Sequence, residues 1–307
     1  MNERLADISA RVDGIRQLGA VVNAMRGIAA ARAQQARSQL SAVDGYAATI
    51  AVAIGRALAL VPSARPGAAG KSTRPALVLF CAEQGFVGAF SEHVLDVVGA
   101  DLASSELFLI GTRGGAVATE RGVTAAWKSP MPSHSLGVPK LADRIAEALY
   151  ARVATKEIDR LDAVFSQWQP GHGIHVERRR LFPFDMSVFP RPMYANAPLL
   201  NLASETLLSE LTADYMHAQL CNAALHAFAA ENEARMEAMA SAHNQIECQL
   251  SSLRATQRLV RQEEITAEII ELAAGETASR SDHNQAAAVC KSSGSAVHRS
   301  RSTGRIL

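Results

Sequence analysis

Aromatic residues make up only 5% of this 307-residue sequence, and neither sign of charge is in excess. Scarce aromatic residues and abundant alanine suit long helices better than β-sandwiches. Lys and Arg together number 31 and Asp and Glu number 30, so the formal net charge is +1. This balance argues against a broadly basic nucleic-acid-binding protein and against a strongly acidic one.

Long apolar runs and paired cysteines are also missing. The longest apolar run near the start, residues 47–55, is far shorter than the roughly 20 residues that a membrane span needs. The first 13 residues lack the apolar core of a signal peptide, so we expect a soluble chain. The cysteines show no C-x-x-C spacing, which argues against a zinc or redox site and favours a reducing compartment. They are Cys81, Cys221, Cys248 and Cys290.

Motifs that bind phosphate or perform catalysis are absent as well. The loop Gly85-Phe86-Val87-Gly88 follows a strand-like run, yet neither G-x-G-x-x-G nor G-x-x-x-x-G-K-[ST] occurs. We interpret it as a tight turn in which Gly85 and Gly88 are structural, and residues 111–115 as a plain loop. No H-E-x-x-H or G-x-S-x-G motif occurs either. The sequence therefore predicts no catalytic residue, no cofactor and no metal site.

Two long segments lack proline and carry an apolar period of about 3.5 residues. Residues 1–61 and 201–278 each repeat apolar side chains at steps of three or four, which predicts two long helices with coiled-coil seams. Packing the two helices against each other in antiparallel orientation would bury both seams. Beyond them, residues 279–307 show no sustained period and carry five basic residues against one acidic residue. We expect this last segment to be a disordered basic tail.

The segment between the helices has a different composition. A linker at 62–75, rich in Pro, Gly and Ala, precedes an expected α/β domain over 76–200. Alternation of strands and helices predicts a βαβ-type, Rossmann-like sheet. The strands are expected at 76–82, 106–111, 161–168 and 174–184, and the helices at 91–102 and 139–155. The predicted fold class is α/β: an antiparallel coiled coil of both termini with an inserted α/β domain.

The two expected helices also carry basic and apolar stretches that are candidates for contact with a partner. Residues 14–43 contain four arginines and no acid, which indicates either an ordinary solvated face or a face for an acidic partner. Arg254, Arg258 and Arg261 form a second basic stripe. Apolar residues at 265–272 are too numerous for one seam. They indicate that something other than the partner helix encloses this end.

Four segments, taken in order, resemble the gamma chain of rotary F-type ATP synthases. Residues 23–31 (NAMRGIAAA) resemble its Lys-Ala-Met and Met-Val-Ala-Ala region, and 85–90 (GFVGAF) its Gly-Leu-Cys-Gly-Gly-Phe. Residues 233–239 (EARMEAM) and 261–271 (RQEEITAEIIE) resemble its Ala-Ala-Arg-Met-x-Ala-Met and Arg-Gln-x-x-Ile-Thr-x-Glu segments. Departures at 18–22 and 82–84 resemble the alternate, N-type bacterial branch.

The resemblance implies a non-catalytic central-stalk rotor that couples ion flow to ATP synthesis or hydrolysis. Its coiled coil would turn inside a hexamer of alpha and beta chains, with its sheet domain near the epsilon chain and the membrane c-ring. The complex would lie at the cytoplasmic face of a bacterial plasma membrane as a peripheral assembly. The residues that match the motifs, and that we expect at the hexamer, are Met25, Arg26, Arg235, Met239, Arg261, Gln262, Thr266 and Glu268.

Two other classes remain open from the sequence. One is a nucleotide-binding α/β enzyme that dimerises through its coiled coil, and the other is a free-standing coiled-coil scaffold. Micromolar binding of ATP or NAD to the isolated chain would favour the enzyme, whereas stable folding alone would favour the scaffold. Co-purification with alpha- and beta-type chains would favour the rotor. The coupling ion stays open, since no ion site is evident in the sequence.

Overall fold

The computed structural model describes residues 2–60, 74–154, 158–190 and 200–296. The chain forms two compact units, one of residues 1–20 with 244–307 and the other of residues 21–243. Each unit is described by itself below. Most of the expected linker at 62–75 lies outside the described residues.

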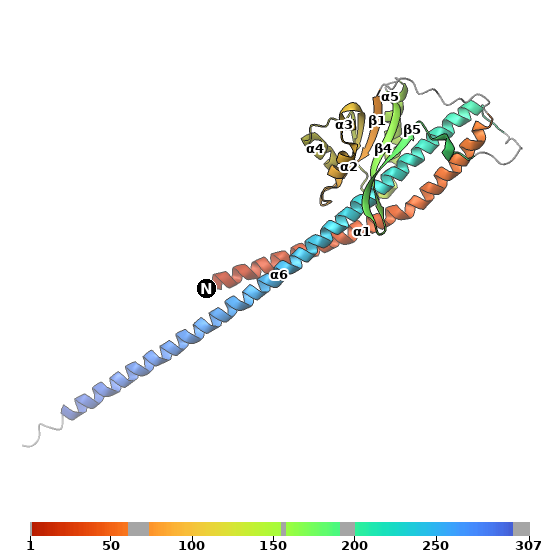
Figure 1. The fold of residues 1–307 in the computed structure, drawn as a ribbon. Helices are drawn as coiled ribbons and strands as arrows, with labels where there is room; N and C mark the ends of the chain where they lie inside the picture. The colour runs from red at the N-terminus through yellow and green to blue at the C-terminus, as the bar shows by residue number, and fades with distance from the viewer. Residues whose placement is uncertain (1, 61–73, 155–157, 191–199, 297–307) are drawn as a thin grey trace, which may run out of the picture. The chain divides into compact units, whose positions relative to one another are not determined.

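Two long helices occupy the proline-free segments (Figure 1). Helix α1 spans Asn2–Leu58 and helix α6 spans Ser204–Ala296. Helix α6 therefore continues past residue 278, where the sequence led us to expect a disordered tail. An alanine run at 286–288 and the lack of proline after Pro198 are compatible with continued helix. The last expected tail residues, 297–307, lie outside the described residues.

A five-stranded sheet lies between the two long helices in the sequence. Its order is β3-β2-β1-β4-β5, in which β4 and β5 are antiparallel and the other neighbours are parallel. The strands are β1 (Arg74–Phe80), β2 (Glu106–Ile110), β3 (Trp127–Ser129), β4 (Ile158–Gln169) and β5 (Gly173–Phe182). The sequence reasoning missed β3, because three residues give too short a pattern to recognise.

Helices cover both faces of this sheet. One face packs Leu77, Leu79 and Leu109 against the short helices that follow β1 and β2. The other packs Phe80 and Phe165 against the helix before β4 and against α6. The helices are α2 (Phe90–Val98), α3 (Asp101–Ser104), α4 (Thr112–Glu120) and α5 (Val138–Ala154), with 3₁₀ turns η1 (Ser135–Gly137) and η2 (Met186–Val188).

The expectation of a plain loop at 111–115 is wrong, because α4 begins at Thr112. Its first turn is unusual in holding two glycines. A Cβ atom added to Gly114 would lie only 2.0 Å from the Cβ of Cys81. The glycine therefore allows α4 to approach the end of β1 closely, which is a packing role that composition alone did not reveal.

Within the larger unit, α1 and α6 pack in antiparallel orientation. Asn222 of α6 donates a hydrogen bond to Asp44 of α1 at 2.6 Å. Arg37, which precedes Asp44 in α1, pairs with Glu233, which follows Asn222 in α6. Ile54 packs in one cluster with Tyr215. In the smaller unit, Gln257 of α6 donates to Ser9 of α1 at 2.9 Å.

Gly55 of α1 allows a close approach to the segment after β5. A Cβ atom at this position would lie 2.0 Å from the carbonyl oxygen of Pro190. We expect Gly55→Ala to lower the free energy of unfolding by about 1–3 kcal/mol, because backbone must shift to make room. Gly45→Ala is the matched control, since nothing lies within 4 Å of its added Cβ. It should raise stability by about 0.5–1 kcal/mol. Urea denaturation of both variants measures the difference, and equal effects would contradict this packing.

Candidate functional site

The glycine loop at 83–89 joins β1 to α2 at the carboxyl edge of the sheet. Phe86 takes a left-handed backbone conformation (φ 61°) and Gly88 does so too (φ 60°). The expected turn is present, and at Gly88 the conformation is one that glycine adopts without strain. Phe86 is 66% exposed despite its size, so the turn presents an aromatic side chain to the surroundings.

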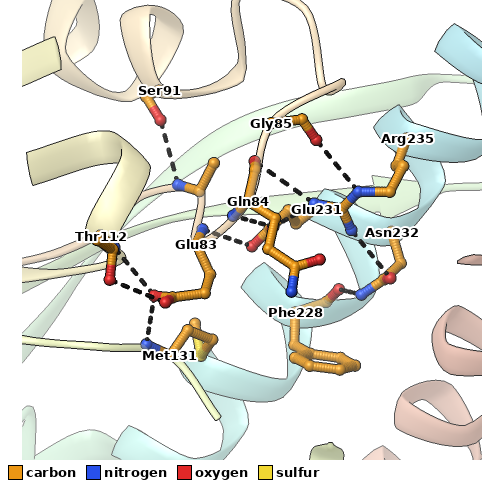
Figure 2. A network of polar contacts seen from close by, with 11 residues as sticks. Glu83, Gln84, Gly85, Ser91, Thr112, Met131, Phe228, Glu231, Asn232 and Arg235 are labelled. Atoms are coloured by element: carbon orange, nitrogen blue, oxygen red, sulfur yellow. Dashed lines mark hydrogen bonds and ion pairs between the residues drawn. The ribbon is translucent and has the colours of Figure 1, made fainter. Parts of the chain in front are cut away.

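Two carboxylates of the chain accept hydrogen bonds from the backbone amides at this edge of the sheet (Figure 2). Glu231 of α6 accepts hydrogen bonds from the amides of Glu83 and Gln84, at 3.1 and 3.2 Å. Glu83 accepts from the amides of Thr112 and Met131, at 2.9 and 2.8 Å. These amides stand where a phosphate would bind in a dinucleotide fold. Two glutamates fill that place, one of them at the N-terminus of α4.

Arg235 completes the network from one turn farther along α6. Its guanidinium pairs with Glu231 at 2.6 Å and donates to the amide oxygen of Asn232 at 3.1 Å. It also donates to the carbonyl oxygen of Gly85 at 3.3 Å (Figure 2). Arg235 is 6% exposed and Glu231 is 4% exposed. The buried ion pair therefore fastens the glycine loop to α6.

A buried thiol, that of Cys81, lies next to this network. Cys81 at the end of β1 is buried, and burial raises the pKa of its thiol to about 12, with a further contribution from the negative charge of Glu231. A thiol with so high a pKa carries almost no thiolate at neutral pH. Among the described residues, no cluster of His, Cys, Asp or Glu could hold a metal ion.

A second polar cluster joins α1, α6 and β5. Arg179 of β5 donates to the amide oxygen of Asn222 at 2.8 Å, and its guanidinium lies over the ring of Phe165, 4.9 Å from the centroid. His226 of α6 stacks on Phe165, with the ring centroids 5.9 Å apart. Arg37 of α1 lies over Trp168 at 4.7 Å. Cations and aromatic rings thus link the helices to the sheet.

His226 gives this cluster a pH dependence. Burial, then the positive charge of Arg179 and of His175, lower its pKa, against the opposing effect of Asp44 and Glu177. The imidazole is therefore more readily protonated in the unfolded chain, whose pKa is about 6.5. We therefore expect the free energy of unfolding to fall as the pH drops from about 6.5, the pKa in the unfolded chain, toward the lower pKa of His226 in the folded chain. The fall is at most about 1.4 kcal/mol per pH unit.

The check is chemical denaturation of the wild type and of His226→Gln between pH 8 and pH 5. The variant keeps a polar side chain but cannot titrate, so its stability should decline less steeply. Parallel curves for the two proteins would contradict an origin in His226.

The eight expected partner-contact residues fall into three groups. Arg235 and Met239 are 6% and 4% exposed, so their side chains pack inside the chain, and a contact between them and the hexamer stays a prediction. The motif spacing could not show this, because it does not reveal which side of α6 the sheet covers. Met25 and Arg26 are half-buried, and Arg26 donates to Asn23 at 3.0 Å.

The other four residues lie on an exposed stretch of α6 in the smaller unit. Arg261, Gln262, Thr266 and Glu268 are all exposed, and the Thr266 hydroxyl donates to the carbonyl oxygen of Gln262 at 2.8 Å. Large apolar side chains accompany them, each between 50% and 70% exposed, which we name the apolar end of α6. They are Leu259, Ile265, Ile269, Ile270 and Leu272. Apolar residues gathered in this way mark an interaction surface.

The sequence reasoning missed Glu83, Glu231 and the exposed Phe86. A signal was available for Glu231, because it stands four residues before Arg235 on the same helix face in a largely apolar stretch. Glu83 carried no such signal, since its partners are amides that the fold brings together.

Comparisons with known proteins give one consistent family. A family model described as ATP synthase matches residues 4–278. The ATP synthase gamma chain of Parafrankia sp. (strain EAN1pec) is 26% identical over 91% of this chain and 98% of its own length. That of Chlorobium luteolum is 27% identical over 88% and 97%.

Among solved structures, a chain of the Euglena gracilis mitochondrial ATP synthase (OSCP, F1 and c-ring) aligns with a TM-score of 0.59 at 12% identity. The match covers 99% of this chain and 100% of that chain. A rotor chain of the same enzyme gives a TM-score of 0.58 over 86% of this chain. At this identity the likeness concerns the fold, which is mixed α/β with a mainly parallel sheet and long helices. No helix within the described ranges is long and apolar enough to cross a membrane.

Proposed function

This chain belongs to the gamma-chain family of the ATP synthases and is a central-stalk rotor subunit, and from that premise we propose how it transmits rotation. Helices α1 and α6 form an antiparallel coiled coil that turns within a hexamer of alpha and beta chains, and the apolar end of α6 runs in an apolar sleeve. The observation that carries this proposal is the run of large apolar side chains left exposed at 259–272. A helix end that slides against a partner needs an apolar surface, because many hydrogen bonds to the partner would hold it in one position.

The chain itself is proposed to be non-catalytic, with ATP bound by its partners. Glu83 and Glu231 support this, because their carboxylates occupy the strand-end amides that a nucleotide phosphate would need. The neighbouring thiol of Cys81 is buried and protonated at neutral pH. The alternative of a nucleotide-binding enzyme gains no comparable support.

We propose two kinds of contact with the hexamer. Polar side chains at Arg261, Gln262, Thr266 and Glu268 meet loops of the sleeve beside the apolar end of α6. Met25 and Arg26 on α1 contribute a basic, half-exposed face that suits acidic loops of the beta chains. Phe86 is a further candidate, since a loop fastened by Glu231 holds it outward.

The sheet domain serves as the proposed link to the epsilon chain and the c-ring. Glu231 of α6 accepts hydrogen bonds from amides of the domain's glycine loop, and Arg235 of α6 donates to the carbonyl oxygen of Gly85. Torque delivered to the domain can therefore pass into the helix. The complex is proposed to be peripheral, at the cytoplasmic face of a bacterial plasma membrane, and to couple to protons or sodium ions.

Met25→Lys tests the contact on α1. An added cation beside Arg26 can pair wrongly with an acidic loop and stabilise one rotor angle by about 1–3 kcal/mol. We expect ATP hydrolysis to continue while ions pumped per ATP fall, with Met25→Leu as a control that keeps the wild-type ratio. Ion transport and ATP hydrolysis by reconstituted vesicles measure the number of ions pumped per ATP. An unchanged number for Met25→Lys would mean that Met25 does not contact the hexamer.

Co-purification tests the assignment as a whole. A tagged full-length chain should bring down alpha- and beta-type chains in a three-to-three-to-one ratio, and the chain alone should neither hydrolyse ATP nor bind it at micromolar concentration. Recovery of the chain only as a dimer that binds ATP or NAD would favour the enzyme alternative.

A further inference from the structure

A groove of about 580 Å³ lies between the edge strand β3 and helix α5, within the larger unit. Residues of both elements line it, and they include Trp127 and Lys128 of β3 and Arg144, Glu147, Ala148 and Ala151 of α5. The α5 residues fall three or four positions apart, so they share one face of the helix. An extended peptide can bind at such a place by adding a strand to the edge of the sheet.

The open side of β3 is where a further strand can pair. Strand β3 pairs with β2 and is the last strand of the sheet on that side. The Gly111 amide donates to the carbonyl oxygen of Ser129 at 3.0 Å, so the backbone groups of Ser129 point toward β2. Because these groups alternate in direction along a strand, the amide and the carbonyl of Lys128 point to the open side. They offer one donor and one acceptor to an added strand.

Trp127 and two small residues of α5 give the groove an apolar lining. Trp127 is partly exposed, and its ring packs on that of Phe108, with the centroids 6.2 Å apart at 41°. Ala148 and Ala151 leave room beside the strand, because their side chains end at Cβ. Tryptophan is among the residues that contribute most to binding at protein interfaces. An aliphatic side chain of a peptide can therefore be buried against this ring.

The charged residues of the groove favour an acidic occupant. Lys128 and Arg144 are both exposed, and within the described ranges neither side chain forms an ion pair. Arg152 also lines the groove and pairs with Glu106 at 3.2 Å. Among the described residues that line the groove, Glu147 is the one carboxylate. The surplus charge is therefore positive, and carboxylates of a partner would complement it.

We propose that the groove between β3 and α5 binds an extended acidic segment of another protein. The segment pairs with the backbone of Lys128 as an additional strand, buries an aliphatic side chain against Trp127 and places carboxylates beside Lys128 and Arg144. The opposite edge of the sheet is β5, which is bonded to α6 through Arg179 and Asn222. A partner docked on β3 therefore binds the sheet domain at the edge that α6 does not use.

Binding of two labelled peptides to the purified full-length chain tests the proposal. The probe is fluorescein-labelled Glu-Asp-Val-Thr-Val-Asp-Glu, and its counterpart, Lys-Lys-Val-Thr-Val-Lys-Lys, has the same apolar core and the opposite charge. Fluorescence polarisation at low salt should show saturable binding of the acidic peptide and at least about tenfold weaker binding of the basic one, because like charges repel across a contact. Amide hydrogen exchange at residues 126–129 should slow when the acidic peptide is bound, because an added strand protects the amide of Lys128.

Three variants locate the site. Lys128→Glu should weaken binding of the acidic peptide about three- to tenfold. Lys140→Glu makes the same charge change at an exposed lysine outside the groove and should weaken binding less than about twofold. Ala151→Phe fills the groove from an exposed position and should abolish binding while the chain stays folded.

Several results would overturn the proposal. They are an absence of saturable binding to the wild type, equal binding of the basic peptide, unchanged exchange at residues 126–129, equal losses in the two lysine variants, and wild-type binding by Ala151→Phe. None of these outcomes depends on assembly with alpha and beta chains.

Discussion

Replacing Arg235 by leucine should lower the free energy of unfolding by about 3–5 kcal/mol, which is the cost of leaving a buried carboxylate without its cation. Glu231 is 4% exposed and would keep only its two amide donors from the glycine loop. The loop would also lose the bond from Arg235 to the carbonyl oxygen of Gly85. We therefore expect the glycine loop and α6 to separate first.

Arg121→Leu is the matched control for this substitution. Arg121 pairs with Asp96 at 2.5 Å, but both side chains are exposed, and exposed pairs contribute about 0–1 kcal/mol. Chemical denaturation measures both free energies, and amide hydrogen exchange at residues 83–89 shows where the structure opens. Equal losses in the two variants would mean that the buried pair is not a fastening point.

The second large effect is expected at the apolar end of α6. The double substitution Ile269→Asp and Ile270→Asp should weaken assembly with the alpha and beta chains at least tenfold. Burial of each isoleucine is worth about 1.5–3 kcal/mol, and each aspartate would in addition be desolvated in the sleeve. Folding of the chain alone should not change, since both isoleucines are at least 60% exposed.

Ile270→Leu provides the control, because it keeps an apolar side chain of the same volume at the same position. Reconstitution with purified alpha and beta chains, followed by size-exclusion chromatography, measures assembly. If the double aspartate variant assembles as tightly as the Ile270→Leu control, the apolar end does not meet the sleeve.

The sequence predicted the long helices and the first strand because both depend on local patterns. Proline-free segments with apolar steps of three and four produced α1 and α6, and the uninterrupted run at 76–82 produced β1. Strand β3 was not predicted, because three residues are too few to show an alternating pattern. Helix α4 was not predicted, because Gly114 lowers the helix propensity of the segment. The close approach of Gly114 to Cys81 depends on tertiary packing, which the sequence does not show.

The site was less accessible to sequence reasoning. The bond from the Gln84 amide to Glu231 joins residues 147 apart in the chain, and no short motif records such a distance. Arg235 and Met239 were assigned to a partner because they match a family motif, whereas burial places them inside. The exposed residues at 261–268 stay predictions, because their role depends on chains beyond this one.

Whether the sheet domain rotates during ATP hydrolysis decides whether this chain acts as a rotor. Cys248→Ser and Cys290→Ser leave two buried thiols, Cys81 and Cys221, whose pKa values burial raises to about 12. Ser133→Cys then adds a reactive thiol at an exposed position of the domain. With the hexamer fixed to a surface and a bead on residue 133, we expect one-directional rotation with three pauses per turn, one for each beta chain. Sustained ATP hydrolysis without rotation of the bead would contradict it.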